Sequence, residues 1–99
     1  MAQSTQVVFG KRAKAAILTT ALFIEESGYP DTAIDFAQRQ SNFGYTLADF
    51  PEKYPLCRFP RFSKRNYRCA VFESNYVFVY KQVRNQLRIY NIIHTKRLK

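Results

Sequence analysis

Hydrophobic and polar residues follow two different periods along the chain. Between residues 11 and 50 the apolar positions recur every three to four residues, which is the period of an amphipathic helix. Residues 67–94 instead form short runs rich in Val, Ile, Phe and Tyr, separated by brief polar breaks. These residue types fit a pleated, half-buried surface, so the pattern predicts helices followed by strands.

Three strands are predicted in the second half of the chain, at Tyr67–Phe72, Tyr76–Val83 and Leu87–His94. The breaks are Glu73-Ser74-Asn75 and Arg84-Asn85-Gln86. Each break is short and polar and contains an Asn, which tolerates the positive φ that tight hairpins demand. The three strands should therefore form an antiparallel meander.

Two helices are predicted before the meander, after a short first strand at residues 5–9. Ser27-Gly28-Tyr29-Pro30 ends the first helix and opens the second, because Gly suits a helix C-terminus and Pro a first turn. Gly44 costs about 1 kcal/mol relative to Ala and predicts a bend or fraying in the second helix, which Pro51 ends. The apolar stripes are Ile17, Leu18, Ala21, Leu22 and Ile24 in the first helix, and Ala33, Phe36, Ala37, Gln40, Phe43, Leu47 and Phe50 in the second.

Residues 51–66 are the least regular part of the sequence. Prolines at positions 51, 55 and 60 argue against a helix, and residues 56–62 suit an irregular edge strand. The predicted order is strand, helix, helix, and then three or four strands. We therefore expect a single α+β domain over residues 1–99, with an antiparallel two-helix hairpin packed on one face of a 3–4-stranded antiparallel sheet.

Charge is distributed very unevenly. Residues 1–57 carry a net charge of −1, whereas residues 58–99 carry +10 with Glu73 as their only acid. Such segregation favours a polyanion or an acidic protein partner, the alternative being a basic surface that only keeps the protein soluble. Guanidinium groups bind phosphate in a fixed geometry, so the candidate phosphate or nucleic-acid ligands are Arg58, Arg61, Lys64, Arg65, Arg68 and Lys96.

Cys57 and Cys69 are the only cysteines. Two cysteines do not make a disulfide framework or a metal site, so we expect two reduced thiols that serve as small buried groups. No apolar run has the length of a membrane span, and the first ten residues lack the pattern of a signal peptide. These features predict a cytoplasmic protein without a metal or cofactor.

The order of several motifs resembles that of the RelE/ParE superfamily, the small toxins of bacterial type II toxin–antitoxin systems, which include plasmid stabilisation proteins. The motifs are Leu47-Ala48-Asp49-Phe50-Pro51, Asn66-Tyr67-Arg68, the aromatic Tyr76–Tyr80 strand, and Ile92-Ile93-His94-Thr95-Lys96-Arg97. The resemblance spans nearly the whole chain. It implies a toxin that a cognate acidic antitoxin holds inactive, with no small-molecule substrate and no membrane.

The resemblance implies two mechanisms, which the sequence leaves open. One is ribosome-dependent mRNA cleavage, with Arg61, Arg68 and Arg97 on phosphate and His94 as general acid or base. The other is inhibition of DNA gyrase, as in ParE-like members, without catalytic residues. Thr95 stands where some nuclease members have a tyrosine, and the sequence ends at Lys99 without a further helix.

A different class of function also fits the residues, because a fold alone does not imply an activity. It is a non-toxic basic module, or a degenerate toxin, that binds RNA or an acidic protein. His94 would then be a strand-end side chain without chemistry; by strand alternation it should share a face with Ile92, Tyr90 and Arg88. Strand tyrosines stack on bases in some RNA-binding proteins and pack in most others, and the candidates are Tyr67, Tyr76, Tyr80 and Tyr90.

Overall fold

The computed structural model describes residues 5–98 and has the predicted order of elements. No helix within these residues is long and apolar enough to cross a membrane. The elements are β1 (Gln6–Phe9), α1 (Lys11–Glu26), α2 (Pro30–Thr46), the one-turn helix α3 (Pro60–Ser63), β2 (Arg68–Phe72), β3 (Tyr76–Val83), β4 (Gln86–His94) and the 3-10 turn η1 (Thr95–Arg97).

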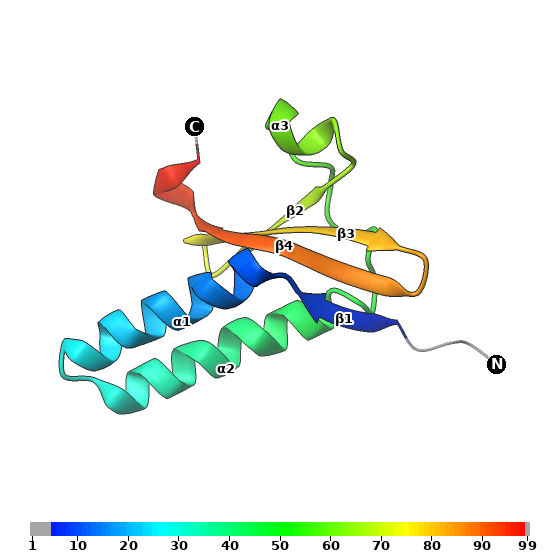
Figure 1. Cartoon of the computed structure of the whole chain (residues 1–99). Helices are drawn as coiled ribbons and strands as arrows, with labels where there is room; N and C mark the ends of the chain where they lie inside the picture. Colours follow the sequence, from blue (N-terminus) through cyan, green and yellow to red (C-terminus); the bar gives the residue numbers. More distant parts are fainter. Residues whose placement is uncertain (1–4, 99) are drawn as a thin grey trace.

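The four strands form one sheet in the order β1-β4-β3-β2 (Figure 1). Strands β2, β3 and β4 are the predicted antiparallel meander. Strand β1 pairs in parallel with β4, from Gln6 opposite Gln86 to Phe9 opposite Ile89. The sheet is therefore mixed, and the prediction of a wholly antiparallel sheet is wrong at this edge.

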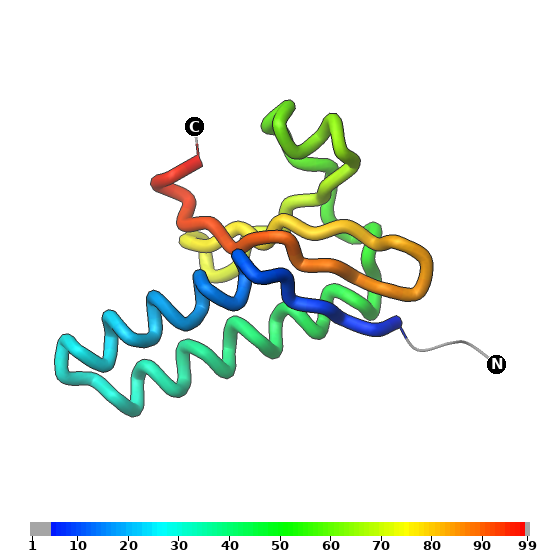
Figure 2. Tube along the Cα trace, in the orientation of Figure 1, coloured from blue at the N-terminus to red at the C-terminus, as the bar shows by residue number. Residues whose placement is uncertain are grey.

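Helices α1 and α2 form the predicted antiparallel hairpin, which lies along one face of the sheet and extends beyond it (Figures 1 and 2). Part of the predicted apolar stripe of α1 is consequently not buried: Leu18 is 59% exposed and Phe23, beside that stripe, 69%. Helix α3 lies on the other side of the sheet (Figure 1). We call the two sides the helix face and the opposite face.

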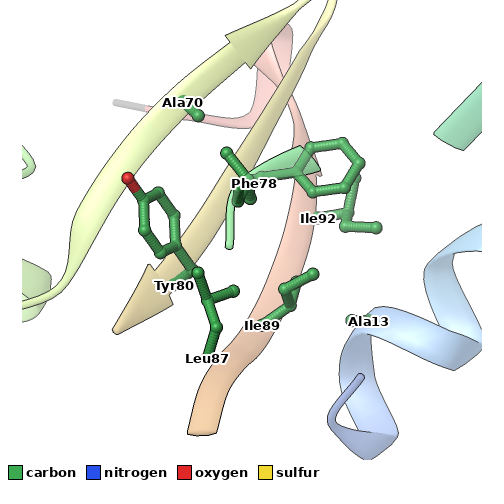
Figure 3. Packing of buried hydrophobic residues seen from close by; sticks show 8 residues of the cluster. Ala13, Ala70, Phe78, Tyr80, Leu87, Ile89 and Ile92 are labelled. Atoms are coloured by element: carbon green, nitrogen blue, oxygen red, sulfur yellow. The ribbon is translucent and has the colours of Figure 1, made fainter. Parts of the chain in front are cut away.

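Each face of the sheet has its own apolar cluster. Alternation along β3 sends Phe78 and Tyr80 to the helix face and Val77 and Val79 to the opposite face, and all four are buried. On the helix face, Ala13 of α1 packs against the strand residues (Figure 3). The members of this cluster are Ala13, Leu47, Ala70, Phe78, Tyr80, Leu87, Ile89 and Ile92.

Gly44 marks the closest approach of α2 to the sheet. A Cβ atom at this position would lie 2.6 Å from Cζ of Phe9 and 2.8 Å from Cδ1 of Ile89. Helix α2 continues through Gly44 and ends at Thr46. The glycine is thus required by packing, and the prediction that treated it only as a weak point of the helix missed this role.

The segment before β2 differs from its prediction. Residues 60–63 form a helical turn with Pro60 at its start, because a proline is excluded only from a helix interior. Of the predicted edge strand, only Leu56 makes an isolated β-bridge, with Arg68. Both hairpins also differ from their prediction. Positive φ values fall on Glu73 (51°) and Ser74 (64°) in the first and on Arg84 (56°) in the second, and not on Asn75 or Asn85.

Cys57 and Cys69 form a disulfide, with their Cα atoms 4.8 Å apart, so the prediction of two reduced thiols is wrong. Two backbone hydrogen bonds bring the cysteines together. The Cys57 N–H donates to the Tyr67 carbonyl oxygen (3.0 Å), and the Cys69 N–H donates to the Pro55 carbonyl oxygen (3.2 Å). The disulfide closes residues 57–69 into a loop, which we call the basic loop because it carries Arg58, Arg61, Lys64, Arg65 and Arg68.

Candidate nucleic-acid interface

A register shift between β3 and β4 decides which side chains share a face. Asn91 pairs with Val79 and Ile89 pairs with Tyr80, so Tyr90 is the extra residue of a bulge. Beyond the bulge the alternation of β4 is reversed. His94 and Ile92 therefore lie on the helix face while Tyr90 and Arg88 lie on the opposite face, and the predicted shared face is wrong.

Tyr90 belongs to an aromatic cluster on the opposite face. The ring centres of Tyr67 and Tyr90 lie 5.2 Å apart, and the two rings are inclined by 31°. Phe62, which α3 positions, meets them edge-on at 6.5 Å from Tyr67 and 6.4 Å from Tyr90. Phe62 is buried and both tyrosines are half-buried, so these rings form a fixed part of the second apolar cluster.

Three cations lie over these rings. Nζ of Lys81 is 5.0 Å from the centre of the Tyr67 ring, and it donates a hydrogen bond to the Arg65 carbonyl oxygen at 3.0 Å. Cζ of Arg12 is 5.8 Å from the centre of the Tyr90 ring, and Cζ of Arg61 is 4.7 Å from that of Phe62. Each such contact contributes about 0.5–1 kcal/mol at an exposed site, which favours these side-chain positions over others.

No carboxylate among residues 5–98 forms an ion pair with these cations. Both ion pairs found within residues 5–98 belong to Arg39, with Asp35 and with Glu73. Arg88 pairs with Lys81 in the strand register and adds a further cation beside it. We call Arg12, Arg61, Lys81 and Arg88 the basic face, together with the exposed Arg65, whose carbonyl oxygen accepts the hydrogen bond from Lys81.

Arg68 lies on the helix face, where its side chain makes a hydrogen bond within the fold. Its Nη1 donates a hydrogen bond to the Tyr54 carbonyl oxygen at 2.6 Å. Its cross-strand partner Tyr80 donates from Oη to the Pro51 carbonyl oxygen, also at 2.6 Å, and burial raises the pKa of Tyr80 to about 12. These two hydrogen bonds hold the segment between α2 and β2 against the sheet.

His94 stands far from Arg68. Its strand partner is Tyr76, whereas that of Arg68 is Tyr80, so the two lie about 13 Å apart along the sheet. Nδ1 of His94 accepts a hydrogen bond from the Lys96 N–H at 3.2 Å. His94 and Arg97 share a cleft on the helix face, on the other side of the sheet from Arg61.

The four predicted catalytic residues are thus not brought together, whereas part of the predicted phosphate set lies on one exposed loop. Arg58, Lys64 and Arg65 are exposed on the basic loop, and Lys96 is exposed in η1. Arg12 and Lys81 were not among the predicted site residues. For Arg12 the sequence does hold a signal, because cations are disfavoured in the first turn of a helix, where it lies beside Lys11.

Within residues 5–98 no three His, Cys, Asp or Glu side chains are placed to hold a metal ion. Comparison with known proteins finds no family model and no curated protein that matches the sequence. The basic face offers several positive charges over aromatic rings, an arrangement suited to a polyanion backbone.

Proposed function

We propose that the chain is a growth-inhibiting toxin of the RelE/ParE type that binds RNA through its basic face. The observation that carries the proposal is the placement of Arg12, Arg61 and Lys81 over three packed rings, without an acidic partner. Cations held in this way need little further ordering to contact successive phosphates. A cognate antitoxin with an acidic segment would compete for the same surface.

The tyrosines of the basic face support phosphate binding more than base stacking. Lys81 and Arg12 lie over the rings of Tyr67 and Tyr90, so a base would have to displace a cation before it could stack there. Tyr80 is fully buried and cannot meet a base. We therefore infer that binding depends on charge and is nearly independent of RNA sequence.

The positions of the predicted catalytic residues favour RNA binding over RNA cleavage. General acid–base catalysis needs its groups within hydrogen-bond reach of one reacting centre. Arg68 is bonded to the Tyr54 carbonyl, and His94 lies on the face opposite to Arg61. The inhibitor would then act by occupying RNA rather than by cutting it.

Inhibition of a protein target such as gyrase is the second candidate, and a specific feature favours it. The helical hairpin extends beyond the sheet and exposes large apolar side chains, among them Leu22, Phe23 and Ile34. Exposed apolar side chains on a projecting element suit a protein contact.

The test is inducible expression in a bacterial host, with growth and primer extension on a reporter mRNA as readouts. RNA binding predicts that Arg12→Ala with Lys81→Ala relieves growth inhibition, that His94→Ala does not, and that no new mRNA ends appear. Lys53→Ala is a matched control, because Lys53 also lies over a tyrosine ring, at 5.5 Å from that of Tyr54, outside the basic face. Growth inhibition that requires His94 but not Lys81 would contradict the proposal, and inhibition of gyrase supercoiling would favour the second candidate.

A further inference from the structure

A cleft of about 600 Å³ lies on the helix face, between the helical hairpin and the ends of β3 and β4. Its size falls in the range of small-molecule sites. Phe23 of α1, Phe36 of α2 and Tyr76 of β3 supply aromatic lining. Edge-to-face contacts join Phe36 to Tyr76 (5.5 Å between ring centres) and Tyr76 to His94 (5.3 Å), so that one wall is a packed row of rings.

The cleft contains a buried amide without a partner. Gln40 lines it and is only 1% exposed. Neither Oε1 nor Nε2 of Gln40 has a hydrogen-bond partner among the residues that the structure describes. A buried amide that makes no hydrogen bond is unfavourable, and an apolar side chain of similar shape would suit a purely structural position better. Gln40 therefore points to a ligand that offers both a donor and an acceptor.

The side chains that can carry a charge in the lining of the cleft are basic. Arg97 and His94 line the cleft, and among the residues that the structure describes no Asp or Glu lines it. An exposed guanidinium over an apolar cleft selects a ligand with an anionic group, which it can bind through two parallel hydrogen bonds.

We propose that this cleft binds a small amphipathic organic acid that carries an amide next to its carboxylate, as an N-acylated amino acid does. The carboxylate pairs with Arg97, the apolar group packs against Phe23 and Phe36, and the amide hydrogen-bonds to Gln40. This site is separate from the basic face, because it lies on the other side of the sheet. The proposal for this cleft can therefore be tested independently of RNA binding.

The chain contains no Trp, so the fluorescence of a tryptophan-based probe can be followed without a tryptophan signal from the protein. N-acetyl-L-tryptophanate has the proposed chemistry, and N-acetyl-L-tryptophanamide is its neutral counterpart. Titration of each probe with the full-length protein should give a saturable change in tryptophan fluorescence for the acid. The amide should bind at least about tenfold more weakly, because it lacks the charge that meets Arg97.

Two substitutions test the assigned contacts. Arg97→Ala should weaken binding of the acid about tenfold and abolish its preference over the amide, whereas Arg84→Ala, in the turn at the far end of β4, should change neither. Gln40→Leu should weaken both probes while leaving the melting temperature equal or higher, because it removes an unpartnered amide. The proposal is overturned if the acid does not bind saturably, if both probes bind equally, or if either Arg97→Ala or Gln40→Leu leaves binding unchanged.

Discussion

The rings of Tyr67 and Tyr90 lie with their centres 5.2 Å apart on the face of the sheet that the helical hairpin leaves open. Tyr90 lies on this face with Arg88, and the bulge at Tyr90 places Ile92 and His94 on the helix face instead. Lys81 and Arg12 lie over the two rings. The two rings and these cations make up the surface on which the proposed RNA binding depends.

Arg68→Ala should destabilise the fold rather than remove an RNA ligand. The substitution leaves the Tyr54 carbonyl without the hydrogen bond that it accepts from Nη1. Hydrogen bonds from charged groups contribute about 1.5–3 kcal/mol, so chemical denaturation should show a loss of that size. Arg58→Ala, at an exposed position of the basic loop, should change stability by less than about 0.5 kcal/mol. An unaltered stability of Arg68→Ala, with lost RNA affinity, would contradict this assignment.

Reduction of the Cys57–Cys69 disulfide should lower the free energy of unfolding by about 3 kcal/mol, the loop-closure entropy of a chain segment with a separation of 12 residues. Reduction should also weaken RNA binding, because it frees the loop that carries Arg61 and Arg65. Denaturation with and without dithiothreitol measures the first effect. The double variant Cys57→Ser with Cys69→Ser is the control, and reductant should leave its stability unchanged. Equal stability of the oxidised and reduced wild type would refute the prediction.

Gly44→Ala should be destabilising although alanine is the better helix former. The added Cβ would meet Phe9 at 2.6 Å and Ile89 at 2.8 Å, and overpacking of this kind costs about 1–3 kcal/mol. The gain in helix propensity is only about 1 kcal/mol. Thermal denaturation should therefore give a lower midpoint for Gly44→Ala, whereas Asn42→Ala, at an exposed position of the same helix, should be neutral or slightly stabilising. A higher midpoint for Gly44→Ala would show that the helix can move away from the sheet.

Tyr80 should make the fold sensitive to alkaline pH. Burial raises its pKa to about 12, above the usual value of 10, so the unfolded chain loses the phenolic proton first. The stability contributed by the neutral phenol is complete below pH 10 and is lost as the pH rises from about 10 towards 12. Stability measured across this range should fall less steeply in Tyr80→Phe than in the wild type. Tyr29→Phe, at an exposed tyrosine, should follow the wild-type curve.

Hydrophobic periodicity predicts the two long helices, the meander and the α+β fold, but not the one-turn helix α3. The meander follows from alternating apolar runs and short polar breaks, and the structure begins and ends each strand within one residue of its predicted bounds. The parallel pairing of β1 with β4 could not be predicted in this way, because a period describes one strand and not its neighbour. The close contact of Gly44 with Phe9 likewise depends on the approach of two elements that are distant in the sequence.

The candidate site was harder to predict because it also depends on residues that are distant in the sequence. Charge segregation favours a polyanion or an acidic protein partner and places most candidate ligands in the basic loop. It could not reveal that Arg12, from the other end of the chain, lies over Tyr90. Family resemblance grouped Arg68 with His94, but strand register separates them along the sheet. The bulge at Tyr90 changes which side chains share a face without altering the composition of the strand.

The most direct test of the account is the salt dependence of RNA binding, followed by fluorescence anisotropy of a short labelled single-stranded RNA. Removal of one phosphate-binding cation should reduce the slope of log affinity against log salt concentration by about 0.7, so Arg12→Ala with Lys81→Ala should reduce it by about 1.4. Lys53→Ala should keep the wild-type slope. A wild-type slope in the double variant, or an equal loss in Lys53→Ala, would show that RNA does not bind at the basic face.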